Sequence, residues 1–321
     1  MKEINYDART LMYGKYPKIQ KLGACSPYGE MTPFVFNGRL MRMELVDISH
    51  GTETGNNDIH AIIRDVETGE VISRFAYGCY YHATYTEGDT VYVTAVKSLC
   101  QKPQNGETLK LFGDTIMIFE SKDLVNWTSR ELFQREGWCF FNTSLAKGND
   151  GYVLCVESNY SPEDDVGIPF TCYFVKSPDM KTWEFMSYDT AYPKHRYCGG
   201  PCMKYYNGYF YLFLVTELPC QRYTNYLFRT KHFEEWEVAY YNPVLMPSEE
   251  DKMLSPRAVE REKYESFLEN GFNINNSDID FCEWQGKTYI NYVLGNQLGF
   301  YCMCEAEYDG TVGEFLEGYF R

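Results

Sequence analysis

The sequence predicts an all-β fold built from repeated units, and three observations support this prediction. Aromatic residues form 17% of the 321-residue chain, with 29 Tyr and 21 Phe, and both residue types favour strands. A strand–turn–strand pattern recurs five times, and a shorter pattern that ends in Trp recurs three times. The apolar fraction of 44% and the charged fraction of 23% exclude a disordered chain, a collagen and a coiled coil.

Each of the five repeats consists of a short strand, a tight turn with Gly, and a second strand rich in aromatic and β-branched residues. Turns such as Asn37-Gly38, Asp150-Gly151 and Asn207-Gly208 supply the residues that tolerate positive φ, which two-residue hairpin loops require. The five copies cover residues 31–46, 81–96, 142–158, 199–217 and 278–296.

A second repeated element follows three of these hairpins. It reads SKDLVNW over 121–127, SPDMKTW over 177–183 and, in a weaker form, TKHFEEW over 230–236. Each copy lies between two further strand-like runs, so a complete unit has four strands. Four-stranded units that repeat five times are typical of a β-propeller. We therefore predict one five-bladed β-propeller domain over residues 1–321, with residues 1–30 as an N-terminal extension that packs on it.

One helix is predicted, over Pro256–Gly271, inside an insertion at 246–277 between the fourth and fifth blades. Pro lies near its start and Gly follows its end, as helix boundaries favour. Such an insertion can decorate the propeller rim, cover its mouth, or act only as a packing element.

The charge and cysteine content exclude several classes of partner. The net charge is −15 and no basic stripe is present, so nucleic acid is not an expected partner. No stretch approaches about 18 apolar residues, so no membrane span is expected. The N-terminal segment has no apolar run of a secretory type, so we expect a cytoplasmic protein with reduced cysteines, although a removed leader stays open. We expect no metal and no cofactor, because neither zinc-ligand spacing nor a phosphate-binding loop occurs.

The inner strands of a propeller begin at one face and surround a central funnel. Alignment of the five hairpins on their turn Gly places five residues at these openings: Thr32, His82, Thr143, Gly200 and Asp280. The second strands return to the same face and carry Glu44, Glu157 and Glu217 near their ends. A buried carboxylate is costly unless it is paired or lines a wet cavity.

Converging carboxylates at a concave mouth are what glycoside hydrolysis requires, since one donates a proton and the other acts as nucleophile or base. We predict Glu157 and Glu217 as this catalytic pair. The substrate-binding candidates around them come from several blades: Asp280, Glu44, His82, His195, Arg196, Trp138 and Tyr81.

The Trp corners, the hairpin repeat and the fifth-unit run at 275–299 resemble the five-bladed propeller glycosidases. This superfamily includes the family 43 and family 32 arabinofuranosidases, xylosidases and fructosidases. The resemblance covers the chain from about residue 31 to its end. The three acidic residues typical of family 43 would fall at Thr32-Pro33, at Asn142 or Thr143, and at Gly199-Gly200-Pro201, and none of these residues is acidic.

Two interpretations follow from these departures. Either the carboxylates have moved to the second strands, or catalysis is lost and the funnel only binds sugar. We predict a glycosidase that releases a terminal sugar, with arabinofuranose as the candidate, from an oligosaccharide. The alternatives are a non-catalytic carbohydrate-binding propeller and a phosphorylase, which would need several Arg or His residues at the funnel to hold phosphate.

Overall fold

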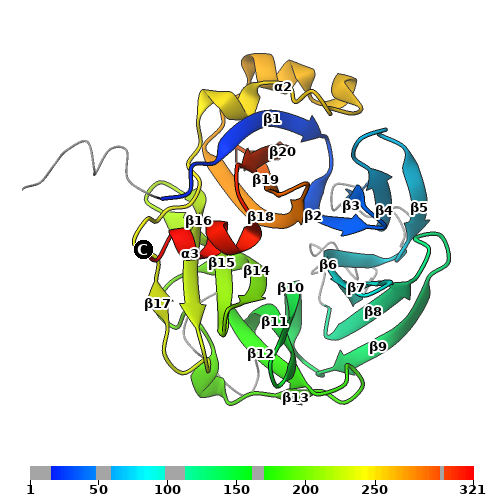
Figure 1. The fold of residues 1–321 in the computed structure, drawn as a ribbon, viewed down its shortest axis with the longest axis vertical. Helices are drawn as coiled ribbons and strands as arrows, with labels where there is room; N and C mark the ends of the chain where they lie inside the picture. Colours follow the sequence, from blue (N-terminus) through cyan, green and yellow to red (C-terminus); the bar gives the residue numbers. More distant parts are fainter. Residues whose placement is uncertain (1–15, 48–58, 98–112, 161–169, 297–299) are drawn as a thin grey trace, which may run out of the picture.

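The structure, a computed structural model, describes residues 16–47, 59–97, 113–160, 170–296 and 300–321. Within these residues, strands β1–β20 form five four-stranded antiparallel sheets. The sheets surround a central axis, and the inner strands β2, β6, β10, β14 and β18 lie nearest to it (Figure 1). The predicted five-bladed β-propeller is therefore confirmed.

Each blade is made of four strands, which are named here in their order from the central axis outward. Blade 1 contains β2 (Gly29–Phe36), β3 (Arg39–Asp47), β4 (Ile59–Asp65) and β5 (Val71–Phe75), and blade 2 contains β6 (Cys79–Glu87), β7 (Thr90–Lys97), β8 (Thr115–Ser121) and β9 (Thr128–Gln134). Blade 3 contains β10 (Cys139–Gly148), β11 (Gly151–Tyr160), β12 (Thr171–Ser177) and β13 (Glu184–Phe185), followed by the short 3-10 helix η1 (Tyr188–Thr190). Blade 4 contains β14 (Cys198–Tyr206), β15 (Tyr209–Leu218), β16 (Arg222–Thr230) and β17 (Glu237–Val238), and blade 5 contains β18 (Asn275–Trp284), β19 (Lys287–Gly295), β20 (Tyr301–Tyr308) and β1 (Gln20–Ser26).

Local sequence explains the turns and corners of the blades. Asn37-Gly38 and Asn207-Gly208 have positive φ at both residues, as the hairpin turns that match strand twist require. The Trp corners lie between the third and fourth strands of blades 2, 3 and 4. The Trp127 ring stacks on Phe75 of the preceding blade, with ring centroids 3.9 Å apart. The corner Trp residues thus bury apolar surface between neighbouring blades.

The ring is closed by a strand from the beginning of the chain. β1 pairs antiparallel with β20, so it is the outermost strand of blade 5. From the sequence, residues 1–30 were predicted to form an extension packed on the propeller. The structure instead places 20–26 inside a blade and starts blade 1 at Gly29, while residues 1–15 lie outside the described part.

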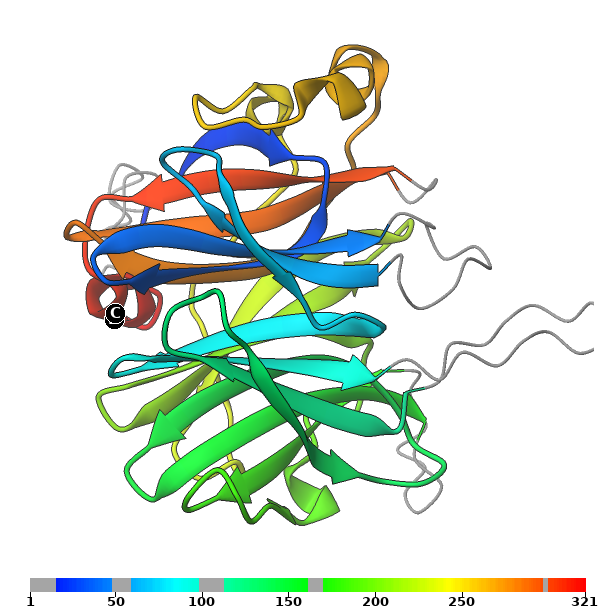
Figure 2. The same ribbon diagram turned by 90° about the vertical axis from the view of Figure 1, so that its right-hand side faces the viewer.

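The insertion between blades 4 and 5 differs from the single helix predicted over Pro256–Gly271. It contains the 3-10 helices η2 (Glu249–Lys252) and η3 (Arg261–Lys263) and the short helix α2 (Glu265–Asn270). A continuous helix is interrupted because Glu260 adopts a left-handed conformation, with φ of 51°, and because backbone groups of the segment bind β1 instead. Ser255 N donates to Ala24 O and Val259 N to Cys25 O, both at 2.9 Å. The insertion lies outside β1 at the periphery, away from the axis (Figures 1 and 2).

A helix near the end of the chain, α3 (Val312–Gly318), was not predicted from the sequence. Thr311 and Glu314 form its capping box, and Phe315 and Leu316 are fully buried in the core between blades 4 and 5. The helix is short and lies next to strand sequence, so the sequence pattern did not indicate it. In the part of the chain that the structure describes, no helix has the length and apolarity needed to cross a bilayer.

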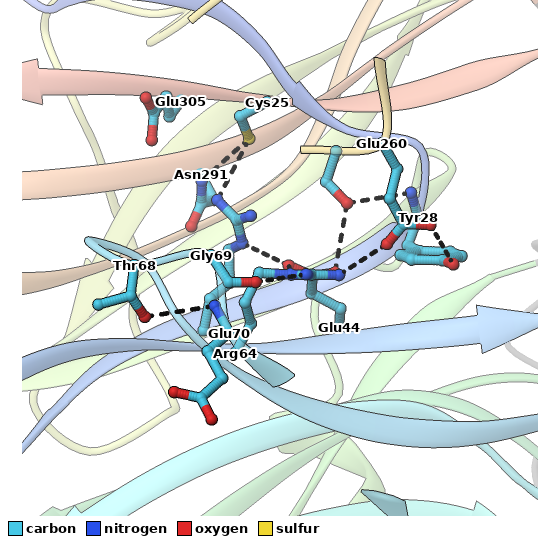
Figure 3. Close-up of polar contacts among 12 residues, drawn as sticks. Cys25, Tyr28, Glu44, Arg64, Thr68, Gly69, Glu70, Glu260, Asn291 and Glu305 are labelled. Carbon is cyan, nitrogen blue, oxygen red and sulfur yellow. Dashed lines mark hydrogen bonds and ion pairs between the residues drawn. The ribbon is translucent and has the colours of Figure 1, made fainter. Parts of the chain in front are cut away.

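A buried ion-pair cluster connects blade 1 to the insertion (Figure 3). Glu44 is 0% exposed and accepts from Arg42 Nε at 2.8 Å and from Arg64 Nε at 2.9 Å. Arg64 Nη2 also donates to Glu260 Oε1 at 2.9 Å. The prediction that Glu44 binds substrate is therefore wrong. Its carboxylate is paired with two guanidinium groups in the protein interior, where an unpaired charge would be costly.

We expect the Glu44→Gln variant to lose about 3–5 kcal/mol of unfolding free energy, because it leaves two buried guanidinium groups short of their counter-ion. Equilibrium denaturation in urea measures the loss. Glu237→Gln is the matched control, since Glu237 also pairs with an arginine, at 2.6 Å from Arg229, but is 52% exposed. That variant should lose less than about 1 kcal/mol. Equal losses in the two variants would contradict the assignment.

Candidate active site at the axial opening

Each inner strand is interrupted by a β-bulge close to its start. The bulges fall between Gly29 and Met31, Tyr80 and Ala83, Phe140 and Thr143, Gly199 and Cys202, and Ser277 and Asp280. In four of these bulges one residue has positive φ: Glu30 (47°), Tyr81 (56°), Gly200 (50°) and Asp278 (47°). A bulge bends the strand and redirects a side chain. The same irregularity therefore recurs around the axis at equivalent places.

These bulges line a small pocket at the axial opening. Its walls come from all five blades: Glu30, Thr32, His82, Ala83, Asn142, Thr143, Gly200, Pro201, Asp278, Ile279 and Asp280. All five residues that the hairpin alignment placed at the strand openings are among them. The pocket encloses about 30 Å³, which is about the volume of one water molecule. A sugar ring is larger, so it would rest over this floor.

Glu157 is held beside this pocket by two hydrogen-bond donors. Its Oε2 accepts from Asn142 Nδ2 at 3.0 Å and from Gly200 N at 2.9 Å, and the residue is 3% exposed. Burial, together with the nearby charge of Asp278, raises the pKa of Glu157 to about 8, although both hydrogen bonds oppose the shift. At neutral pH the carboxyl group is therefore mostly protonated.

A pair of glycines makes room for two carboxyl groups. A Cβ at Gly199 would lie 3.1 Å from Glu157 Oε1, and a Cβ at Gly200 would collide with Asp278 Oδ1. Gly200 also has the left-handed conformation that side chains disfavour. Asp278 accepts from Ser277 Oγ at 2.5 Å, and burial raises its pKa against that hydrogen bond. Because residues 199 and 200 have no side chains, the carboxyl groups of Glu157 and Asp278, which come from other strands, can lie directly against this backbone.

Glu30 is a third carboxyl group at the opening, and the sequence analysis missed it. Its Oε2 is buried without a hydrogen-bond partner among the described residues. Burial, followed by the charges of Asp278 and Glu157, raises its pKa well above the usual range, while the Tyr81 backbone N–H opposes the shift. Glu30 lies two residues before Thr32-Pro33, so a search that allowed for a bulge could have found it.

The charges of neighbouring acids contribute to two of the three raised pKa values. The charge of Asp278 helps to raise the pKa of Glu157, and the charges of Asp278 and Glu157 help to raise that of Glu30. For Asp278 the raising cause is burial. Pairs of carboxyl groups with separated pKa values can divide the roles of acid and base. Among the described residues, no three His, Cys, Asp or Glu side chains are grouped closely enough to hold a metal ion.

Three further predicted residues lie at or beside the pocket. Asp280 lines it, but its carboxylate is paired with Lys204 Nζ at 2.7 Å and accepts from Cys202 Sγ at 3.2 Å. His82 is 5% exposed, both ring nitrogens lack a hydrogen-bond partner within the described ranges, and burial lowers its pKa to about 3. His82 is therefore neutral. The half-buried Tyr81 has its pKa raised by burial and by Glu30 and Glu157, which places its hydroxyl near both acids.

The remaining predicted residues lie elsewhere. In blade 3 the first pair after the bulge is Thr143 with Val156, and Glu157 directly follows Val156. In blade 4 the equivalent pair is Cys202 with Phe213, so the residue after Phe213 matches Glu157. Glu217 lies three residues further along the strand and is exposed. Trp138 is 1% exposed and packs in the core against Tyr173, with ring centroids 4.8 Å apart.

His195 and Arg196 are not part of the axial pocket either. His195 is exposed and accepts from Arg196 Nε at 3.0 Å. The Arg196 guanidinium lies 5.9 Å from the Phe228 ring centroid. The structure thus brings neither of these residues, nor Glu217, to the three carboxyl groups.

Comparison with solved structures identifies the class of fold. The chain is 12% identical to a glycoside hydrolase, with a TM-score of 0.61 over 97% of both chains. It is 13% identical to the GH43 protein BlXynB from Bacillus licheniformis (TM-score 0.56; 94% of this chain, 57% of that one). It is 8% identical to the α-L-arabinofuranosidase PaAbf62A from Podospora anserina, in complex with cellotriose (TM-score 0.59; 93% and 99%). The chain therefore shares the five-bladed propeller fold of these glycoside hydrolases, as the sequence resemblance predicted. No protein-family model and no curated protein matches it.

The raised pKa of Glu157 predicts a pH dependence of stability. Its folded-state pKa of about 8 exceeds the value of about 4.3 expected in the unfolded chain. The folded protein therefore keeps a proton that the unfolded chain has lost, and stability falls as the pH rises between these values. Relative to Glu157→Gln, the wild type should lose up to about 1 kcal/mol per pH unit in this window. Urea denaturation at pH 5, 6, 7 and 8 measures the difference. Parallel curves for wild type and Glu157→Gln would refute the assignment, and the exposed Glu217→Gln should run parallel to wild type.

Proposed function

We propose that the protein is a glycoside hydrolase that releases a terminal sugar from an oligosaccharide, with arabinofuranose as the candidate sugar. The proposal depends on one observation, the buried Glu157 held near Asp278 at the axial opening, where burial and the charge of Asp278 raise the pKa of Glu157 to about 8. Glycoside hydrolysis uses this combination of a carboxylic acid and a carboxylate. The shared fold with glycoside hydrolases, one of them an arabinofuranosidase, supports the proposal.

In the proposed reaction, Glu157 is the general acid. It donates its proton to the glycosidic oxygen as the bond to the leaving group breaks. Asn142 Nδ2 and the Gly200 N–H already point at Oε2, so they stabilise the carboxylate that remains. These donors are in place before the reaction and need no reorganisation.

Asp278 is the second group: it either takes a proton from a water molecule that attacks the anomeric carbon, or attacks that carbon itself to form a glycosyl-enzyme that water then hydrolyses. In its ionised form Asp278 faces the developing positive charge on the sugar. Burial and the charges of Asp278 and Glu157 raise the pKa of Glu30, which favours the protonated form that donates a hydrogen bond to a sugar hydroxyl. The catalytic pair proposed here is thus Glu157 and Asp278, in place of Glu157 and Glu217.

The phosphorylase alternative has little support in the described residues. Phosphate would need cationic groups at the pocket, but His82 is neutral and Lys204 is paired with Asp280. Carbohydrate binding without catalysis is the remaining alternative, and the variants below distinguish it from hydrolysis.

We expect Glu157→Gln and Asp278→Asn to lower kcat about 10²–10⁴-fold, because each removes a group that transfers a proton or faces the reacting sugar. Glu217→Gln is the matched control and should stay within about twofold of the wild type. A panel of chromogenic furanosides and pyranosides measures the rates. Unchanged activity in both site variants would refute the site. Sugar binding by calorimetry without any release from the panel would favour the binding-only alternative.

The pH–rate profile should have its basic limb near pH 8, the pKa of Glu157. Activity falls as pH rises through this value because the general acid loses its proton. Initial rates of kcat/KM between pH 4 and 10 report the pKa of the free enzyme. For a substrate whose leaving group needs no protonation, such as a dinitrophenyl glycoside, the basic limb should weaken. A limb that is identical for both substrate types would contradict the role of Glu157 as acid.

A further inference from the structure

A second cavity, which we call the side pocket, lies between blade 1 and the insertion. It encloses about 920 Å³, within the range of small-molecule sites. It is lined by Pro27, Tyr28, Leu45, Val46, Asp47, His60, Ile62, Arg64, Val71, Arg74, Glu260, Lys263, Tyr264, Phe300 and Tyr301. The function proposed above does not use these residues.

The side pocket is rich in cationic groups although the chain as a whole has a net charge of −15. Arg64, Arg74 and Lys263 line it together with two acids. Arg64 and Lys263 share Glu260, at 2.9 Å and 2.6 Å. Arg74 is exposed in β5, and its side chain makes no hydrogen bond or ion pair within the described part of the chain. One guanidinium therefore faces the cavity without a counter-ion.

Polar and aromatic groups complete a surface suited to a sugar. The Tyr28 hydroxyl donates to Glu260 Oε2 at 2.8 Å and accepts from Lys263 Nζ at 2.9 Å. Tyr264, Phe300 and Tyr301 supply ring faces and edges. Tyr side chains offer an apolar body with a polar end, which fits the mixed surface of a pyranose ring. The side pocket thus combines aromatic area with donors for an anionic group.

The side pocket reaches the axial site through Tyr301. A Cβ at Gly29 would lie 2.6 Å from Tyr301 Cε2, and Gly29 directly precedes Glu30. Burial and the charges of Glu30 and Asp47 raise the pKa of Tyr301 to about 12. One ring therefore forms a wall of the side pocket and also lies near a carboxyl group of the axial opening.

We propose that the side pocket binds a carboxylate-bearing sugar of the substrate, a uronate, and that Arg74 is its principal anion contact. This inference rests on the proposed function for the position of the scissile bond. The Arg74 side chain has no counter-ion among the described residues, and a uronate carboxylate can accept two parallel hydrogen bonds from its guanidinium. The substrate class is then an acidic oligosaccharide.

Calorimetric binding of tetragalacturonate to the Glu157→Gln variant tests the proposal without interference from hydrolysis. Carboxyl-reduced tetragalacturonate, the same chain without the charge, is the ligand control. We expect the acidic ligand to bind at least about tenfold more tightly. Arg74→Gln, added to Glu157→Gln, should remove that preference and leave binding of the reduced ligand unchanged. Arg222→Gln is the matched control, because Arg222 is an exposed arginine at the start of β16 in blade 4.

Equal affinity for the acidic and reduced ligands, or an acidic preference that survives Arg74→Gln, would overturn the proposal. Displacement of tetragalacturonate by equimolar inorganic sulfate would also overturn it, since it would show an anion site without a requirement for sugar. An Arg74-dependent preference supports it even if the wild type hydrolyses no glycoside. Failure of the proposed function and failure of the side pocket are thus separate results.

Discussion

The exclusion of water from several carboxyl groups at one axial opening is the constraint on which the site depends. Burial disfavours the charged form of each acid, and the charge of the first to ionise raises the pKa of the next. Burial therefore raises the pKa of both Glu157, to about 8, and Asp278, and the charge of Asp278 adds to the shift of Glu157. The same groups in water, or far apart, would keep pKa values in the ordinary carboxyl range.

The propeller produces this arrangement through irregularities at equivalent places in its inner strands. Bulges turn Glu30 and Asp278 to the opening. Gly199 and Gly200 have no side chains, so the carboxyl groups of Glu157 and Asp278 occupy the space beside them. The acids come from different blades, so their approach requires a closed ring. β1 closes the ring, and the ion pairs of Arg64 with Glu44 and Glu260 fasten the insertion to blade 1.

The acidic residues at the opening stand at positions other than those that the resemblance to family 43 leads one to expect. Gly199 lies where the resemblance to family 43 leads one to expect the general acid, and a Cβ there would lie 3.1 Å from Glu157 Oε1. The acids come instead from β2, β11 and β18. Three different strands thus supply carboxyl groups to the same opening. The side pocket beside Tyr301 adds a distinct surface next to this centre.

The sequence by itself determined the five blades, the turns and the residues that open the inner strands, because these follow from short-range patterns of alternation, Gly and Trp. It also singled out Glu157. Only the tertiary structure decided the partners of Glu157, since a bulge shifts side chains by one residue and no local pattern marks it. Asp278 and Glu30, and not the exposed Glu217, therefore lie at the axial opening, and the ion pairs of Glu44 depend on arginines brought together by neighbouring strands. The predicted helix over Pro256–Gly271 was broken for a related reason, because its backbone binds β1, a strand more than two hundred residues away.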